Sequence, residues 1–161
     1  MFRIFYKMLP KVFPFRKNSK IDNFRLSPNG YISGNVYIGE NTYINSGYRI
    51  VTGVNSKVSI GKHCAIGRNF SAASRTHNQI RPTSDEKHDT HLTIENSIVI
   101  GSYIWIGDNV FIKDGVVIED YSIIGANSVV VHDVKKFEIV AGNPAKHIKY
   151  NTKHYKFNDK K

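Results

Sequence analysis

The sequence lacks the features that mark several large classes of protein. It has one cysteine, Cys64, in 161 residues, which excludes an intrachain disulfide and a zinc site made of thiolates alone. No stretch approaches the roughly 18 consecutive apolar residues of a membrane-spanning helix. The first residues include Arg3, Lys7 and Lys11 and lack the unbroken apolar stretch and cleavage site of a signal peptide. We therefore expect a cytoplasmic protein.

Acidic residues are scarce, and the basic excess is unevenly placed. The net charge is +10, yet residues 1–25 hold seven basic and one acidic side chain, and residues 146–161 hold six and one. The 120 residues between them hold ten basic and eleven acidic side chains. This distribution argues against a nucleic-acid-binding fold and a nucleic-acid partner. It predicts either solvated tails or tails that meet phosphates or an anionic surface.

What the sequence does contain is a repeat of six residues. A helix would repeat its apolar positions every 3.6 residues and a flat strand every two. A period of six predicts short strands separated by turns, with one aliphatic residue pointing inward in each hexad. Such strands would form a coiled parallel sheet whose inward residues stack from coil to coil. The aliphatic positions fall in three runs, which are Ile32, Ile38, Ile44, Ile50; Ile60, Ile66, Ala72; and Ile94, Ile100, Ile106, Ile112, Ile118, Ile124, Val130.

This pattern resembles the hexapeptide-repeat left-handed parallel β-helix, in which three hexads form one triangular coil. The resemblance covers residues 31–149 and implies an all-β fold of roughly four to five coils. We expect a basic, aromatic cap or extension at residues 1–30, the β-helix at 31–145 with a long loop at 73–93, and a basic tail at 146–161.

The period breaks at two places. The step from Ile50 to Ile60 is ten residues, and the step from Ala72 to Ile94 is twenty-two. Insertions in a repeat protein form loops, and loops on a rigid scaffold often carry the function. The second insertion is strongly polar, and His77 lies where the chain leaves the repeat. A neutral imidazole there can accept a proton and return it, so His77 is the candidate general base.

The spacing around His77 resembles that of galactoside and maltose O-acetyltransferases. In those enzymes the catalytic histidine follows a ten-residue step and two hexads, as His77 does here. The resemblance implies a catalytic role for His77, while a solvated loop histidine is the alternative. A backbone carbonyl or an acidic residue would orient the imidazole. The acidic candidates are Asp85, Glu86 and Asp89.

Two other groups of side chains are candidates for chemistry. His88 and His91 lie among acidic residues and could bind a metal, as in the γ-class carbonic anhydrases, which share this fold and hold zinc with three histidines. The sequence lacks the tight histidine cluster of that family, so we expect no metal. Cys64 occupies the small-residue position of its hexad, and we expect buried filler rather than a nucleophile.

The most specific sequence motifs lie near the carboxyl end, in the segments IWIGDNV, IGANSVVVHDV and AGNPAKHIK. It resembles the acetyl-CoA-binding end of hexapeptide acyltransferases. Trp105, the sole tryptophan, is placed to offer an apolar face to a pantetheine arm, or else to pack at a subunit interface. Lysines near the end suit the phosphates of the cofactor. The implied cofactor-binding residues are Trp105, Asp108, Ala126, Val131, His132, Lys146 and Lys149.

Some positions depart from the pattern of this family. Asp108 stands where serine is common, and Val131 and His132 stand where Thr-Lys is frequent. On the acceptor side, Gly47 stands where sugar acetyltransferases place an asparagine. The candidates for acceptor binding are Gly47, with Asn45 near it, and Asn55, which lies in the first insertion.

Together these features predict a homotrimeric O-acetyltransferase that moves an acetyl group from acetyl-CoA to a hydroxyl of a sugar or polysaccharide. In the family the site lies between subunits, so His77 and Trp105 would come from different chains. The alternatives are an N-acetyltransferase on an amino sugar or nucleotide-linked sugar, a zinc enzyme like the γ-carbonic anhydrases, and a non-catalytic scaffold. Residues 1–25 interleave apolar with basic side chains, which predicts either peripheral contact with an anionic membrane or a cap over the first coil.

Overall fold

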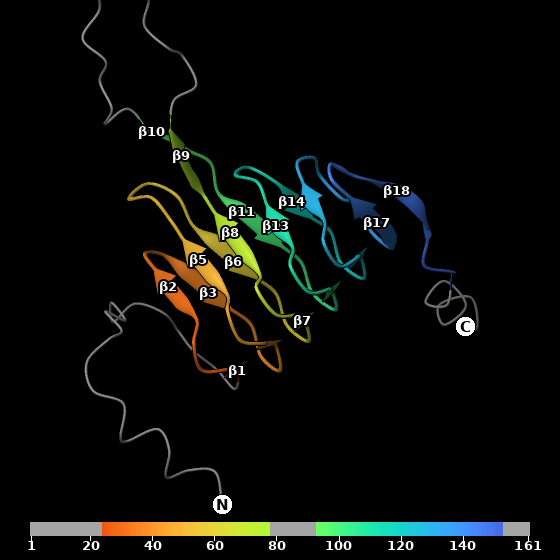
Figure 1. Ribbon diagram of the computed structural model, residues 1–161, viewed down its shortest axis with the longest axis horizontal. Coiled ribbons are helices and arrows are strands. Elements are labelled where there is room, and N and C mark those ends of the chain that lie inside the picture. Colours follow the sequence, from red (N-terminus) through yellow and green to blue (C-terminus); the bar gives the residue numbers. More distant parts are fainter. Residues whose placement is uncertain (1–23, 78–92, 153–161) are drawn as a thin grey trace, which may run out of the picture.

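The chain folds into a parallel β-helix with three sheets as its sides. The computed structural model describes residues 24–77 and 93–152, and all the elements named in this part of the chain are β-strands (Figure 1). The three sides are named sheet A, sheet B and sheet C. In each complete coil the chain adds one strand to sheet A, then one to sheet B and one to sheet C, before the next coil begins. Figure 1 shows the coils following one another from β1 (Arg25–Leu26) at one end to β17 (Glu138–Gly142) and β18 (Ala145–Tyr150) at the other. The six-residue period is thus confirmed as a coiled parallel sheet.

The strands of each sheet come from successive coils. Sheet A is β1 (Arg25–Leu26), β4 (Tyr43–Ile44), β7 (Ala65–Ile66), β12 (Trp105–Ile106), β15 (Ile123–Ile124), β17 (Glu138–Gly142) and β18 (Ala145–Tyr150). Sheet B is β2 (Tyr31–Ser33), β5 (Arg49–Val51), β8 (Ser71–Ala73), β13 (Phe111–Ile112) and β16 (Val129–Val130). Sheet C is β3 (Val36–Ile38), β6 (Val58–Ile60), β11 (Ile98–Ile100) and β14 (Val117–Ile118). A separate antiparallel pair is β9 (Arg75–His77) with β10 (Thr93–Glu95).

The register of the strands stacks the inward aliphatic residues on one another. In sheet A, Ile44 lies beside Ile66, Ile66 beside Ile106, and Ile106 beside Ile124. All four are buried, and sheets B and C contribute similar rows. Burial of these columns supplies the main stabilising free energy of the coils, at about 25 cal/mol per Å² of apolar surface.

One predicted inward position is wrong. Ile94 lies in β10, which pairs antiparallel with β9 outside the coil, and its side chain is 40% exposed. The coil resumes at Ile98, which is fully buried beside Val58. Ile94 lies six residues before Ile100 only because the hairpin strand happens to have that length. Its side chain therefore belongs to the hairpin and does not reach the interior of the coil.

Asparagines form a ladder at the corner between sheets A and B. Asn69, Asn109 and Asn127 have φ of 55°, 58° and 58°, in the left-handed region that asparagine tolerates. Asn69 Nδ2 donates to Asn109 Oδ1 at 2.8 Å, and Asn109 Nδ2 donates to Asn127 Oδ1 at 3.0 Å. Each bond joins one coil to the next, so the ladder fixes the turns that lead into sheet B.

Aromatic rings form a stack at the corner between sheets C and A. His63, Tyr103, Tyr121 and Phe137 also have positive φ, between 57° and 64°. Their ring centroids lie 4.9, 5.0 and 5.2 Å apart in succession, with interplanar angles of 11°, 4° and 17°. Bulky residues rarely adopt this backbone conformation, so the stacking offsets the strain of these four turns.

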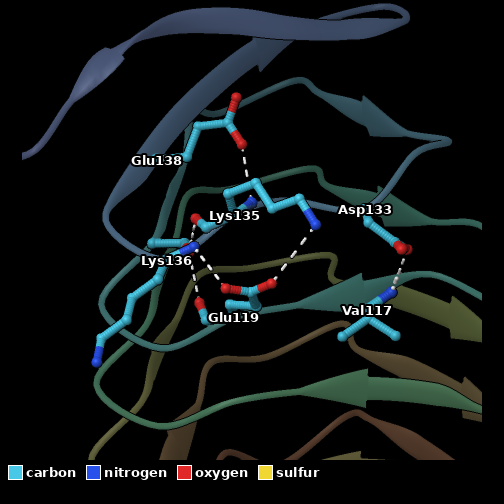
Figure 2. Close-up of polar contacts among 7 residues, drawn as sticks. Val117, Glu119, Asp133, Lys135, Lys136 and Glu138 are labelled. Carbon is cyan, nitrogen blue, oxygen red and sulfur yellow. Dashed lines mark hydrogen bonds and ion pairs between the residues drawn. The ribbon is translucent and has the colours of Figure 1, made fainter.

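Carboxylates close the last coil. Glu119 accepts a hydrogen bond from the Lys136 N–H at 3.0 Å, and its other oxygen lies 3.6 Å from Lys135 Nζ (Figure 2). Asp133 accepts from the Val117 N–H at 2.8 Å, and Glu138 accepts from the Lys135 N–H at 2.8 Å. The turn between sheets C and A is therefore held from both sides before β17 begins.

Strand β1 lies before the expected β-helix limit of residue 31, and β18 extends beyond the limit of residue 145. Strand β1 pairs with β4, and β18 folds back antiparallel on β17. Residues 1–23 lie outside the described part of the chain, and with them most of the expected amino-terminal cap. Among residues 24–77 and 93–152, no helix has the length and apolar character needed to cross a membrane.

Candidate functional site

His77 lies at the end of a hairpin arm that leaves the coil. It is the last residue of β9, it is exposed, and it lies directly opposite Thr93 of β10. Figure 1 shows β9 and β10 extending beyond the layered strands at the corner between sheets B and C. An exposed imidazole at such a place can meet a substrate and exchange a proton with it.

The root of this hairpin is held by buried hydroxyls. Ser74 Oγ, directly before β9, lies 2.8 Å from Ser56 Oγ in the first insertion. Ser56 Oγ also accepts from the Gly53 N–H at 3.0 Å, and the Ser74 N–H donates to the Val51 carbonyl at 3.0 Å. Because these groups are buried and fully paired, they fix the direction in which the hairpin leaves the coil.

Asn55 is brought to the same corner as His77. The two insertions leave successive coils between sheets B and C, and Glu95 of β10 joins them. The Glu95 carboxylate accepts from the Val54 N–H at 3.2 Å and from the Asn55 N–H at 2.6 Å. Reasoning from the sequence did not identify Glu95, because it belongs to no recognisable motif and its partners are 41 and 40 residues away.

Val131 and His132 follow β16 at this corner, two coils beyond the hairpin. Neighbouring strands are about 4.8 Å apart, so two coils correspond to roughly 10 Å along the helix axis. The Asn96 amide at the hairpin base donates to Asp114 Oδ2 at 2.9 Å in the intervening coil. Four of the predicted residues therefore share one edge of the β-helix. They are Asn55, His77, Val131 and His132.

A second group lies on the outer face of sheet A. Trp105 is 59% exposed, as expected for an outward position beside the buried Ile106. The register runs from Trp105 to Ile123, then to Ile139, then to Lys149. Lys146 pairs with Ala141, which alternation places on the same face as Ile139. An apolar row on this face thus ends in two exposed lysines, and both lie in β18 rather than in a tail.

The remaining predicted residues lie at the corner between sheets A and B. Ala126 is exposed and packs over Gly107, where an added Cβ would come within 2.6 Å of the Ala126 nitrogen. Asp108 Oδ1 accepts from the Arg68 N–H at 2.8 Å, so one oxygen of this carboxylate already serves the turn.

Asn45 and Gly47 are at the same A–B corner, in the turn after β4. Gly47 has φ of +80°, and a Cβ there would overlap the Asn69 amide oxygen. Gly47 therefore ends the asparagine ladder. Within one chain, both residues are separated from His77 by the width of sheet B.

Cys64 has the environment of a packing residue. Its side chain is 1% exposed, and its thiol donates to the Gly101 carbonyl at 3.2 Å. Burial raises the pKa of this thiol above its ordinary value, which disfavours the thiolate needed for nucleophilic attack. The prediction of buried filler is confirmed.

The candidate metal ligands fall outside the described part of the chain. His88, His91, Asp85, Glu86 and Asp89 all lie between residues 78 and 92. Within residues 24–77 and 93–152, no three side chains of histidine, cysteine, aspartate or glutamate are grouped to hold a metal ion.

Comparison with known proteins identifies the same repeat. The model of the bacterial transferase hexapeptide, with six repeats, matches residues 97–132. Among curated proteins none matches the chain. Solved structures, in contrast, include several similar acetyltransferases.

Three of these structures are informative. A hexapeptide-repeat acetyltransferase from Vibrio cholerae O1 biovar eltor, complexed with acetyl coenzyme A, is 29% identical with a TM-score of 0.64, over 83% of this chain and 68% of that one. A polySia-specific acetyltransferase is 34% identical with a TM-score of 0.61, over 81% of this chain and 62% of that one. Galactoside acetyltransferase in complex with coenzyme A is 27% identical with a TM-score of 0.62, over 84% and 71%.

The chain thus spans 62% of the polySia-specific enzyme and somewhat more of the other two. The repeat, the parallel coils and these likenesses agree with one another. The chain forms a left-handed parallel β-helix of hexapeptide repeats and is similar to hexapeptide-repeat acetyltransferases.

Proposed function

We propose that the protein is an O-acetyltransferase that moves the acetyl group of acetyl-CoA to a hydroxyl of a sugar or polysaccharide. The observation that carries this proposal is the exposed imidazole of His77 on a hairpin arm of a hexapeptide β-helix. The relatives solved with acetyl coenzyme A or coenzyme A, and those specific for galactosides or polySia, support the donor and the acceptor class.

The reaction needs one proton carrier and no covalent enzyme intermediate. His77 accepts the proton of the acceptor hydroxyl while the oxygen attacks the thioester carbonyl. Backbone N–H groups stabilise the oxyanion, the C–S bond breaks, and His77 returns the proton to the thiolate of coenzyme A. The products are the acetyl ester and free coenzyme A. The buried Cys64 takes no part.

The outer face of sheet A suits the donor. From Trp105 through Ile123 and Ile139 to Lys149 is three strand spacings, or roughly 14 Å. An extended pantetheine arm would lie along the apolar part of this row. The ammonium groups of Lys149 and Lys146 would then meet the phosphates.

We further propose that the active site is shared between subunits of a homotrimer. In one chain, His77 lies at the corner between sheets B and C, while Trp105 lies on sheet A. A base and a donor on different sides of one coil cannot act on the same acetyl group. A neighbouring chain that presents its sheet A to this corner would bring the two together.

Thiol release from acetyl-CoA tests the proposal, with neutral sugars, amino sugars and anionic polysaccharides as acceptors. We expect acceptor-dependent release that falls by about 10²–10⁴-fold in His77→Ala. Binding of coenzyme A, followed by the fluorescence of Trp105, should be retained. His63→Ala, which changes a histidine of the aromatic stack, is the matched control and should keep its activity.

Three outcomes would contradict parts of this proposal. Thiol release that is unaffected in His77→Ala would exclude His77 as the base. Release with amine acceptors alone would indicate an N-acetyltransferase. Absence of coenzyme A binding would exclude the transferase reaction.

Mixed trimers test the shared site. His77→Ala and Trp105→Ala subunits should each be nearly inactive alone, and co-expression should restore part of the activity. Restoration occurs only if an intact His77 and an intact Trp105 can meet from different chains. Mixed trimers as inactive as either parent would contradict a shared site.

The expected membrane contact of residues 1–25 stays a prediction. Binding to vesicles of anionic lipid, compared between the full chain and a chain lacking residues 1–25, tests it. Loss of vesicle binding alone would support the membrane role, and loss of the trimer or of solubility would support a cap.

A further inference from the structure

The corner that carries His77 is where the backbone ladder between coils is interrupted. On one side of the gap, the Ser74 N–H donates to the Val51 carbonyl at 3.0 Å. On the other side, the Ile98 N–H donates to the Lys57 carbonyl at 2.9 Å. Between these bonds both insertions depart from the coil. At the other corners main-chain bonds and carboxylates such as Asp108 and Asp120 join successive coils, and between Val51 and Lys57 side chains supply the bonds.

Glu95 fills this gap. One carboxylate oxygen accepts from the Val54 N–H at 3.2 Å, and the other accepts from the Asn55 N–H at 2.6 Å. A carboxylate that accepts two backbone N–H groups forms charge-assisted bonds, which are stronger than bonds between neutral groups. The second arm of the His77 hairpin is thereby attached to the first insertion.

Gly53 makes room for this contact. A Cβ on Gly53 would overlap the carboxylate of Glu95 at its carbon and both oxygens. The φ angle of Gly53 is not positive, so alanine can adopt the same backbone conformation. The glycine therefore leaves space for the close approach of Glu95, and the turn itself does not call for it.

The hairpin places Glu95 and the imidazole on one face. Glu95 lies opposite Arg75, and Thr93 lies opposite His77. Side chains alternate along a strand, so these four share a face while Thr76 and Ile94 occupy the other. The carboxylate is bound to the Val54–Asn55 segment, so His77 projects from the face that is turned toward Asn55. Along the hairpin, the Glu95–Arg75 pair and the Thr93–His77 pair lie two residues, or about 7 Å, apart.

We propose that Glu95 is a positioning residue that fixes the His77 hairpin against the segment carrying Asn55. This inference rests on the proposed function, with His77 as base and Asn55 beside the acceptor. The Glu95 contact sets the distance between the group that removes the proton and the loop that holds the hydroxyl. The hydroxyl pair of Ser56 and Ser74 holds only the root of the hairpin, and Glu95 orients its arms.

Two variants break the contact from opposite sides. Glu95→Ala removes the carboxylate, and Gly53→Ala keeps it but displaces it. Glu95→Gln retains one acceptor oxygen and should be intermediate. Asp120→Asn is the matched control, because Asp120 accepts from the Ser102 N–H at 2.7 Å at the corner between sheets C and A, away from the site.

The expected result is a loss of turnover without a loss of donor binding. In Glu95→Ala and Gly53→Ala, kcat/KM for the acceptor should fall by roughly 10–100-fold, because small displacements of a catalytic group are costly. The affinity for acetyl-CoA should be unchanged, and Asp120→Asn should keep wild-type kinetics. Amide exchange at Val54 and Asn55 should accelerate in Glu95→Ala, with thermal unfolding recorded to confirm that each variant is folded.

The outcomes separate this inference from the function on which it rests. An active wild type with unaltered kinetics in both alanine variants overturns the positioning role. Unchanged amide exchange at Val54 and Asn55 in Glu95→Ala overturns the contact itself. A wild type that releases no thiol with any acceptor overturns the proposed function and the catalytic part of this inference with it.

Discussion

The aromatic stack at the corner between sheets C and A leads to a prediction about Tyr103. Its φ is +60°, a conformation that costs a residue with a Cβ roughly 1–2 kcal/mol. Its ring lies 4.9 Å from that of His63 and 5.0 Å from that of Tyr121. Each such contact contributes about 0.5–1.5 kcal/mol, so the two together offset the strain.

Alanine and glycine at position 103 should differ in an unusual direction. Tyr103→Ala removes both ring contacts and keeps the strained backbone, so the free energy of unfolding should fall by about 1–3 kcal/mol. Tyr103→Gly loses the same contacts but adopts a positive φ freely, and should be the more stable of the two by roughly 1 kcal/mol. Phe111 in β13, another exposed aromatic, supplies the control because its φ is not positive. There glycine should be less stable than alanine by about 0.5–1 kcal/mol.

Denaturant unfolding followed by circular dichroism measures both pairs, at one protein concentration because subunit association adds to stability. Equal slopes with denaturant would show that the midpoints report stability alone. If glycine is also the less stable variant at position 103, the argument from backbone strain is refuted.

Three further predictions concern the stability of the fold. Burial raises the pKa of the Cys64 thiol, so the stability contributed by the thiol is complete below the pKa of the unfolded thiol and is lost as pH rises through the folded-state pKa. Unfolding curves in which the wild type loses no stability at alkaline pH relative to Cys64→Ala would contradict this. Ile100→Ala should lower the free energy of unfolding by about 2–5 kcal/mol because it leaves a cavity in the core, whereas Ile94→Ala on the hairpin should lower it by less than about 0.5 kcal/mol. Equal losses in thermal unfolding would indicate that Ile94 packs inside the coil. Lys135→Met should change the free energy of unfolding by no more than about 1 kcal/mol, because the side chains of Lys135 and Glu119 are 66% and 45% exposed; a larger loss that disappears in high salt would oppose that estimate.

Local patterning allowed much of the fold to be predicted. On a three-sided coil, one residue of each hexad points inward, so the period alone indicates which side chains are buried. It placed Ile106 inside, Trp105 outside and Cys64 in the packed interior, as observed. It failed at Ile94, because a hairpin arm of suitable length imitates one more hexad.

The candidate site was only partly accessible to the same reasoning. His77 was found because it stands where a regular pattern ends. Glu95 was not, because its role depends on the Val54 and Asn55 N–H groups, which are distant in sequence and carry no side-chain signal. The register of β17 and β18, which places Lys149 in the row of Trp105, is likewise invisible to a six-residue period.

The coil can be read from the chain alone, because a six-residue period is a local property that each hexad carries. Which residues face each other across coils depends instead on the register of the folded strands. Coil neighbours are 18 residues apart at Trp105 and Ile123, 22 apart at Tyr43 and Ala65, and 40 apart at Ala65 and Trp105. The two insertions lengthen the path around the coil without changing the stacking. Contacts between coils, such as the aromatic stack and the bonds of Glu95, therefore follow from the folded register and from no fixed spacing in the chain.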